Sequence, residues 1–150
     1  MDFRRLLATL GLACAPLMVS AADGLIVLKS PHSAQSTMNR LEAIVKERGL
    51  TVFARVDHAG GAAKVGKSIR PTELLIFGNP QGGTPFIECA QTVGIDLPLK
   101  ALVWEDASAQ VWLGYNDTVY LARRHEVPAC AAAANLAKAI ADLAAAAVAP

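Results

Sequence analysis

Residues 100–116, KALVWEDASAQVWLGYN, contain two short apolar and aromatic runs on either side of a short polar segment. The two runs predict two β-strands joined by a turn at about residues 106–109, which commits this part of the chain to an antiparallel sheet. If the strands pair almost symmetrically about the turn, one face carries Leu102, Trp104 and Trp112. Trp104, Trp112 and Tyr115 then either fill the core, as large aromatic side chains on a hairpin usually do, or line a pocket.

The rest of the chain alternates between strand and helix patterns. Ser33 caps a helix whose apolar stripe ends before Gly49, and TVFARVD at residues 51–57 alternates like a strand covered mainly on one side. Thr84 and Pro85 are expected as the N-cap and first residue of another helix. Further strands are expected at 24–29 and 73–77, and further helices at 59–69, 85–93, 118–125 and 129–150. We therefore expect an α+β fold, with a single layer of mostly antiparallel sheet and helices packed on one side.

The first 22 residues have the pattern of a secretory leader. Two arginines precede an apolar run from Leu6 to Val19, and small residues follow at positions 20–22. A signal peptide has a core of roughly 7 to 15 apolar residues, whereas a membrane-spanning helix needs about 20. We expect cleavage after Ala21 or Ala22 and a periplasmic or secreted bacterial protein. The chain then divides into a signal peptide (1–22), one α+β domain (23–128) and an alanine-rich C-terminal helix (129–150).

The charge of the chain bears on its partners. The sequence has 14 Lys and Arg and 13 Asp and Glu, and 12 of each remain without the leader. A near-neutral chain lacks the positive field that nucleic acids and anionic lipid surfaces require. We therefore expect no nucleic-acid binding and no stable membrane insertion after the leader is cleaved.

Residues 60–68, GGAAKVGKS, have the spacing of the phosphate-binding loop of nucleotide hydrolases. In such a loop the Lys-Ser pair opens a long helix whose N–H groups hold the phosphates. Here Pro71 follows Ser68 by three residues, where it removes a backbone donor and breaks a helix. The stretch is therefore expected to be a short helix with exposed lysines, and no nucleotide cofactor is expected.

A second glycine-rich loop, Gly78–Thr84, lies between an expected strand and an expected helix. Backbone N–H groups in that position can face an anion or a polar ligand. The candidate ligand-binding residues are Asn79, Gly82, Gly83 and Thr84, together with His58 at the end of the strand at 51–57. The alternative is a tight turn in which Thr84 only caps the helix.

For catalysis the candidate is His58, acting with Asp57, Glu73 or Glu105 in a small hydrolase or lyase. A regular strand points Asp57 and His58 to opposite faces, so the two do not form a ready dyad. The alternative for His58 is a surface position or a satisfied hydrogen-bonding role. His125 follows two arginines at a helix end, where a charged imidazole complements the helix dipole.

Cysteine and histidine spacing bears on metals and on disulfides. His32, His58, His125, Cys89 and Cys130 show no spacing typical of zinc or haem ligands, so neither a metal nor a cofactor is expected. In an oxidising compartment Cys89 and Cys130 can pair and close a loop of about 40 residues. Otherwise both cysteines are small buried apolar groups.

Between about Val52 and His125 the stretches FGNP, GTP, GIDLPLKALVWED and YND occur in order. They resemble the bacterial domain-of-unknown-function family 302, whose members often follow a leader. The resemblance covers about half of the chain. It implies a compact α+β domain unlike the nucleotide hydrolases, with no agreed activity and no established catalytic residues. The C-terminal helix lies outside it.

Together these features favour an exported domain that binds a small-molecule ligand or acts as an accessory, rather than an enzyme. One alternative is the small hydrolase or lyase that uses His58. The other is a structural or partner-binding subunit, including a homodimer, in which the apolar hairpin or the C-terminal helix forms the interface.

Overall fold

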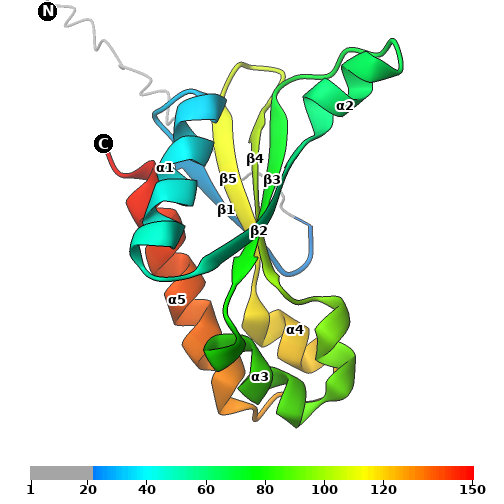
Figure 1. The fold of residues 1–150 in the computed structure, drawn as a ribbon, viewed down its shortest axis with the longest axis vertical. Helices are drawn as coiled ribbons and strands as arrows, with labels where there is room; N and C mark the ends of the chain where they lie inside the picture. The colour runs from blue at the N-terminus through cyan, green and yellow to red at the C-terminus, as the bar shows by residue number, and fades with distance from the viewer. Residues whose placement is uncertain (1–21) are drawn as a thin grey trace, which may run out of the picture.

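A computed structural model describes residues 22–150, so all but the last residue of the expected signal peptide lies outside the described part. Five strands form one antiparallel sheet in the order β1-β5-β4-β3-β2 (Figure 1). The strands are β1 (Leu25–Ser30), β2 (Thr51–Asp57), β3 (Thr72–Gly78), β4 (Leu99–Glu105) and β5 (Val111–Asn116). The hairpin expected from residues 100–116 is β4 and β5, with Trp104 opposite Trp112.

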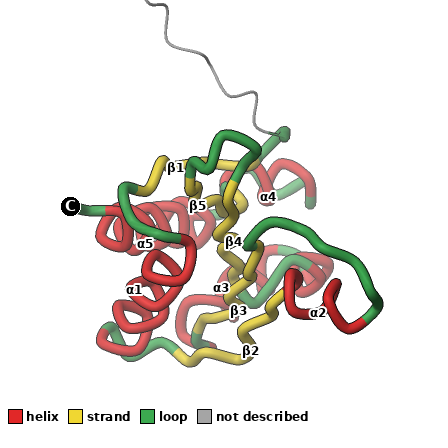
Figure 2. Tube along the Cα trace, turned by 90° about the horizontal axis from the view of Figure 1, so that it is seen from above, coloured by secondary structure: helices red, strands yellow, loops and turns green. Residues whose placement is uncertain are grey.

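The helices cover one face of this sheet and extend beyond one of its ends. They are α1 (Ala34–Glu47), α2 (His58–Lys64), α3 (Pro80–Cys89), the 3₁₀ helix η1 (Gln91–Ile95), α4 (Thr118–Arg124) and α5 (Ala131–Val148). Helices α1 and α5 pack against each other and against one sheet face (Figure 2). At one end of the sheet α3, η1 and α4 cluster around the start of α5, and α2 stands at the other end (Figure 1). The expected α+β architecture is confirmed.

The core lies between this sheet face and the two long helices. On β4 the side chains of Leu99, Ala101 and Val103 are buried, whereas the alternating residues between them are only half-buried. Helix α1 begins at Ser33, whose hydroxyl accepts a hydrogen bond from the N–H of Ser36, and it contributes a fully buried stripe. That stripe is Met38, Leu41 and Val45. Each layer is therefore apolar on the side that faces the other.

The alanine-rich helix is part of this core. Ile140, Leu143, Ala144 and Ala147 of α5 are buried in the same cluster as the sheet residues. By length and composition alone, α5 could also cross a membrane. The small side chains of α5 allow close packing beside α1. Arg40 of α1 donates hydrogen bonds to the carbonyls of Ala147 and Ala149, at the C-terminal end of α5.

The helix expected at residues 85–93 begins earlier, and this prediction was wrong. Asn79, not Thr84, is the N-cap, and its Oδ1 accepts a hydrogen bond of 2.8 Å from the N–H of Gly82. Pro80 occupies the start of the helix, and Pro85 lies inside it. The sequence contains two adjacent cap-proline pairs. Asparagine is the stronger cap, and the earlier start adds a full turn of helix.

The Lys67-Ser68 pair lies after a helix instead of opening one. Helix α2 ends at Lys64, Gly66 has a φ of 72°, and the chain continues without helix to the start of β3 at Thr72. The absence of a long helix opening here agrees with the expectation from Pro71, because a phosphate-binding loop needs the N-terminus of one at this point. The helix expected over residues 59–69 was too long, however, because the chain leaves the helix at Lys64, before Gly66 with its positive φ.

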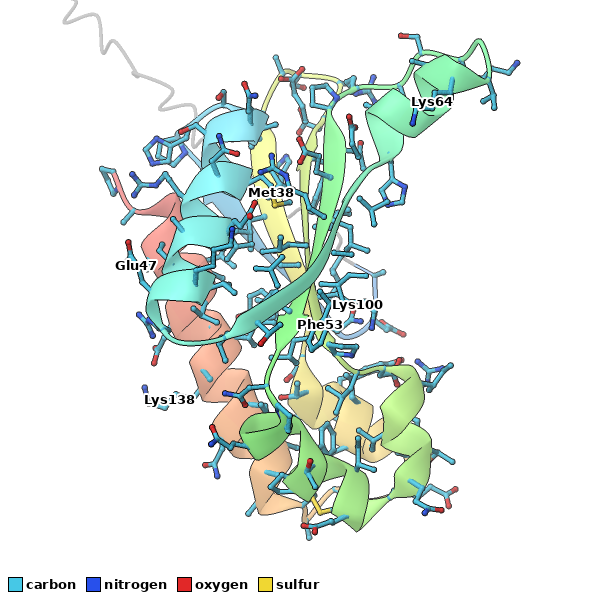
Figure 3. The ribbon with its side chains drawn as sticks, viewed as in Figure 1. Met38, Glu47, Phe53, Lys64, Lys100 and Lys138 are labelled. Carbon is cyan, nitrogen blue, oxygen red and sulfur yellow. A yellow bond between two sulfur atoms is a disulfide. The ribbon has the colours of Figure 1, made fainter. Side chains whose placement is uncertain are left out.

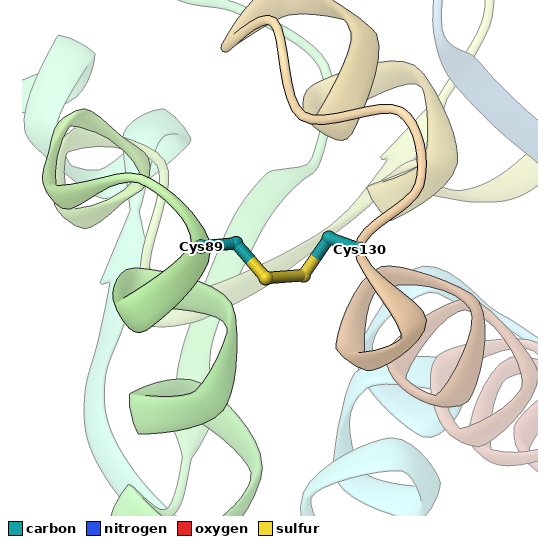
Figure 4. The surroundings of a disulfide bond; sticks show 2 residues. All are labelled: Cys89 and Cys130. Carbon is teal, nitrogen blue, oxygen red and sulfur yellow. A yellow bond between two sulfur atoms is a disulfide. The ribbon is translucent and has the colours of Figure 1, made fainter.

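Two connections hold the cluster of short helices together. Cys89, the last residue of α3, forms a disulfide with Cys130, the N-cap of α5 (Figure 4), with a Cα–Cα distance of 6.2 Å. The second connection, which we call the clasp, joins η1 to the end of α4. In the clasp His125 Nε2 lies 2.6 Å from Asp96 Oδ2, and His125 Nδ1 lies 2.9 Å from Thr92 Oγ1.

Removing the disulfide should destabilise the protein. We expect the double variant Cys89→Ser/Cys130→Ser to lose about 2 to 4 kcal/mol of unfolding free energy, because the unfolded chain regains the freedom of the closed loop. Urea unfolding monitored by circular dichroism measures the loss. Addition of dithiothreitol should lower the stability of the wild type and leave that of the double variant unchanged. If the wild type and the double variant were equally stable without dithiothreitol, this account would be contradicted.

The clasp should stabilise η1 locally. The side chain of His125 is only 8% exposed, so His125→Ala leaves the shielded Asp96 carboxylate with the exposed Arg124 as its remaining side-chain partner and should cost about 1 to 3 kcal/mol. Hydrogen exchange of the amides of residues 91–95 should accelerate. Arg124→Ala is the control, because Arg124 also pairs with Asp96 but is 53% exposed and should contribute about 0.5 kcal/mol or less. Equal effects of the two variants would refute the clasp.

Candidate functional site

A cavity of about 300 Å³ lies where the sheet meets the cluster of short helices. One wall is the first turn of α3, and another is the segment from Leu97 to Leu99 that enters β4. Leu136, Ala139 and Leu143 of α5 form the floor. Phe53 of β2, which lies toward the α3 end of the sheet in Figure 3, completes the lining from the side.

The lining is apolar and uncharged. Every residue that contacts the cavity is a glycine, a proline, an aliphatic residue or phenylalanine, except Asn79 and Thr84. Carboxylates, imidazoles, thiols and ammonium groups are therefore all missing from its walls. Such a cavity recognises a ligand by shape and apolar contact, with a small number of polar groups to orient it.

Asn79, Gly82, Gly83 and Thr84, all four expected from the sequence, line this cavity together. The N–H groups of Gly82 and Gly83 do not point to a ligand, however. Gly82 N–H donates to the side chain of Asn79, and Gly83 N–H donates 3.0 Å to the Asn79 carbonyl. Because these donors are already satisfied, the first turn of α3 is not built to hold an anion.

Gly82 has a packing role in addition. A Cβ at this position would lie 3.2 Å from Leu136 Cδ2 and 3.2 Å from Asn79 Oδ1, closer than ordinary contacts. Glycine therefore lets the first turn of α3 approach α5, and the two helices together shape the cavity.

The wall at residues 96–98 is fixed by polar contacts outside the cavity. Lys100 Nζ donates hydrogen bonds of 2.9 Å to the carbonyls of Asp96 and Pro98, and its burial lowers its pKa. The clasp holds the Asp96 side chain to His125. No sequence pattern indicates the clasp, because His125 follows Asp96 by 29 positions and Thr92 by 33. Fixed walls favour binding, because less freedom is lost when a ligand enters.

His58 lies elsewhere. It is the first residue of α2, at the end of the sheet away from α3, and it does not line the cavity (Figure 1). Asp57 is the N-cap of α2 and accepts a hydrogen bond of 2.8 Å from Gly60 N–H, while Glu73 pairs with Arg55. The structure thus engages both acidic residues in structural contacts and does not assemble them with His58 as an acid–base site.

Metal ligands do not gather in the part of the chain from residue 22 to 150. No group of three or more His, Cys, Asp or Glu side chains in this range is placed to hold an ion. The two cysteines of the range are joined to each other, and His32 Nε2 contacts the carbonyl of Ala149 at 2.7 Å.

The three hairpin aromatics separate. Tyr115 points into the core, whereas Trp104 and Trp112 lie on the opposite sheet face and are only half-buried. The indole N–H of Trp112 donates to Asp106 at 2.8 Å, and this bond lowers the pKa of the Asp106 carboxyl. Neither tryptophan lines the 300 Å³ cavity.

Comparison with curated proteins gives relatives of greater length. The chain is 49% identical over 113 residues to the fluoride-specific ion channel FluC 1 of Brucella suis biovar 1 (strain 1330), which covers 75% of this chain and 44% of that protein. FluC 2 of Brucella melitensis biotype 1 is also 49% identical over 113 residues, covering 75% of this chain and 42% of its own length. The chain thus spans less than half of the curated relatives that it matches.

A solved structure and a family model agree on the domain. The crystal structure of an uncharacterized conserved protein DUF302 from Bacillus stearothermophilus superposes with a TM-score of 0.75 and 22% identity. The superposition covers 83% of this chain and 98% of the Bacillus stearothermophilus chain, which shows that the two share a fold. The family model described as domain of unknown function DUF302 matches residues 26–143, a range that includes most of α5. On the strength of this match, the chain belongs to the DUF302 family.

Proposed function

We propose that this protein is an exported binding module whose cavity takes a small, uncharged and largely apolar ligand. The observation that carries the proposal is the lining of the 300 Å³ cavity, which is uncharged on every side. The volume is at the lower end of the range for small-molecule sites, about 300 to 1,000 Å³. A charged ligand would lose its hydration there without gaining a partner.

The stretches that carry the family resemblance support a binding role for this cavity. FGNP supplies Gly78, Asn79 and Pro80, and GIDLPLK supplies Gly94 and the wall at residues 97–99. The hydroxyl of Thr84 and the side-chain amide of Asn79 are the polar side-chain groups at the wall. They are suited to orient one polar group on an otherwise apolar ligand.

The composition of the cavity lining also favours ligand binding over catalysis. General acid–base and nucleophilic catalysis need a titratable group within hydrogen-bond reach of the reacting atoms. The cavity lining contains none, and His58 is at the other end of the sheet. The geometry therefore favours a binding or accessory module over the hydrolase that uses His58.

Export is the second part of the proposal. The leader-like sequence at residues 1–22 and the disulfide between Cys89 and Cys130 support it independently, because disulfides persist in oxidising compartments. The Brucella relatives are named as fluoride channels, but this chain spans less than half of their length. We do not extend channel activity to this chain.

Blocking the cavity should abolish ligand binding. Ala139 is exposed at the cavity floor, so Ala139→Phe should fill the cavity without disturbing the core. Titration with the apolar fluorescent probe N-phenyl-1-naphthylamine should show binding by the wild type, and affinity at least tenfold weaker in the variant.

The matched control is Ala145→Phe, the same substitution at an exposed position of the same helix outside the cavity. It should bind the probe like the wild type. Thermal unfolding confirms that both variants fold. If the two variants bind equally, or if the wild type does not bind, the cavity is not the ligand site.

Export is tested on the full chain. Expressed with a C-terminal tag in a Gram-negative host, it should appear in the osmotic-shock fraction with the mass of a chain that starts at residue 22 or 23. Replacing both Arg4 and Arg5 with glutamate should leave uncleaved protein in the cytoplasm. A wild-type chain that stays cytoplasmic at full mass would rule out export.

A further inference from the structure

The sheet face away from α1 and α5, which we call the open face, is apolar. The register of the five strands places Val27, Leu74, Ile76, Leu102, Trp104 and Trp112 on it. An antiparallel sheet that is packed on one side normally alternates to polar residues on the other. Within residues 22–150, α1 and α5 lie on the opposite side of the sheet and no helix packs across this face (Figure 2). The six large side chains named above are half-buried.

Beside the open face stands a protruding segment, residues 64–71, which we call the arm. All of its residues are exposed, and helix α2 before it contributes no buried side chain. Val65 is 73% exposed and Ile69 is 49% exposed, which is unusual for large aliphatic residues. Lys64, labelled in Figure 3, lies at the base of the arm, which holds three basic residues and no acidic ones.

Arm and open face together enclose a hollow of about 330 Å³. Ile69 and Arg70 of the arm form one side of it, and Thr72, Leu102 and Trp104 form the other. Glu105 also lines the hollow, and its backbone carbonyl accepts a hydrogen bond of 3.2 Å from Arg70 Nε. The hollow thus combines three apolar side chains, Ile69, Leu102 and Trp104, with polar or charged ones at its border.

The charges on this surface are mostly basic. The residues that the described strands place on the open face include two charged side chains, Lys29 and Lys100, and no Asp or Glu. The arm adds Lys64, Lys67 and Arg70. Two carboxylates lie beside them: Glu105 lines the hollow, and Asp106, in the turn after β4, accepts a hydrogen bond from the indole N–H of Trp112. A ligand that fits this surface needs apolar groups in its centre and negative charge at its margin.

We propose that the open face and the arm form a docking surface for a segment of another protein, apolar at its centre and flanked by Asp or Glu. A second copy docked face to face would bring the same mostly basic patch, which offers little negative charge for the margin. A protein segment can contact both sides of the hollow, Ile69 and Arg70 on the arm and Leu102 and Trp104 on the sheet.

A photo-crosslinker on the arm identifies the occupant. Benzoylphenylalanine replaces Ile69 in the full chain, expressed in the cells that encode it. The control carries the same group at Ile95, which is equally apolar, 75% exposed and at the other end of the molecule. After irradiation, mass spectrometry locates the cross-linked residues. We expect an adduct from position 69, and not from 95, with an acidic and apolar segment of another protein.

Charge reversal tests the electrostatic part. The double variant Lys67→Glu/Arg70→Glu should reduce the adduct from position 69 at least fivefold, as expected for the loss of two favourable charge contacts. Arg123→Glu, an exposed arginine on α4, should leave the adduct unchanged. Circular dichroism shows that each variant folds.

The proposal is overturned by an adduct with a second copy of this chain, with phospholipid, or with a segment that lacks Asp and Glu. It is also overturned if position 69 gives no more adduct than position 95, or if the charge reversal has no effect. Loss of the N-phenyl-1-naphthylamine site leaves this proposal untouched, because the hollow and the cavity share no lining residue.

Discussion

The pairing of β4 with β3 on one side and β5 on the other is the contact on which the other features depend. It fixes the side of the sheet to which each β4 residue points. Leu99, Ala101 and Val103 consequently meet α1 and α5, and Leu102 and Trp104 face away. A slip of one residue would exchange the two sets. The core, the cavity wall at Leu99 and the open face are therefore consequences of one register.

The cavity depends on a second constraint, the rigid cluster at the end of the sheet. An apolar cavity costs packing energy, so its walls must be held apart by contacts elsewhere. Here the disulfide joins α3 to α5, the clasp joins η1 to α4, and Lys100 holds the segment before β4. All three sets of contacts lie outside the cavity lining. The protein thus keeps the space open without placing a charged group in its lining.

Much of the fold could be predicted from local signals. Strand β2 was predicted with its observed bounds, the cap at Ser33 was correct, and the hairpin followed from two apolar runs about a polar turn. The predicted start of α3 was wrong, because two cap-proline pairs compete and the first has the stronger cap, Asn79. Four candidate ligand residues line one cavity because they are neighbours in the chain. His58 does not join them, since its distance from them is set by how β2 and β3 pair.

The sequence by itself determined most of the elements: apolar runs and, in β2, alternating residues predicted strands, an apolar stripe predicted α1, and Pro71 argued against a long helix opening at Ser68. These outcomes depend on interactions between residues a few positions apart, and such interactions are visible in a pattern. Only the tertiary structure decided that the alanine-rich helix belongs to the core, that His125 meets Asp96, and that the tryptophans lie on an uncovered face. Those results depend on which segments that are distant in the sequence pack against each other, and the packing of the whole chain decides these contacts.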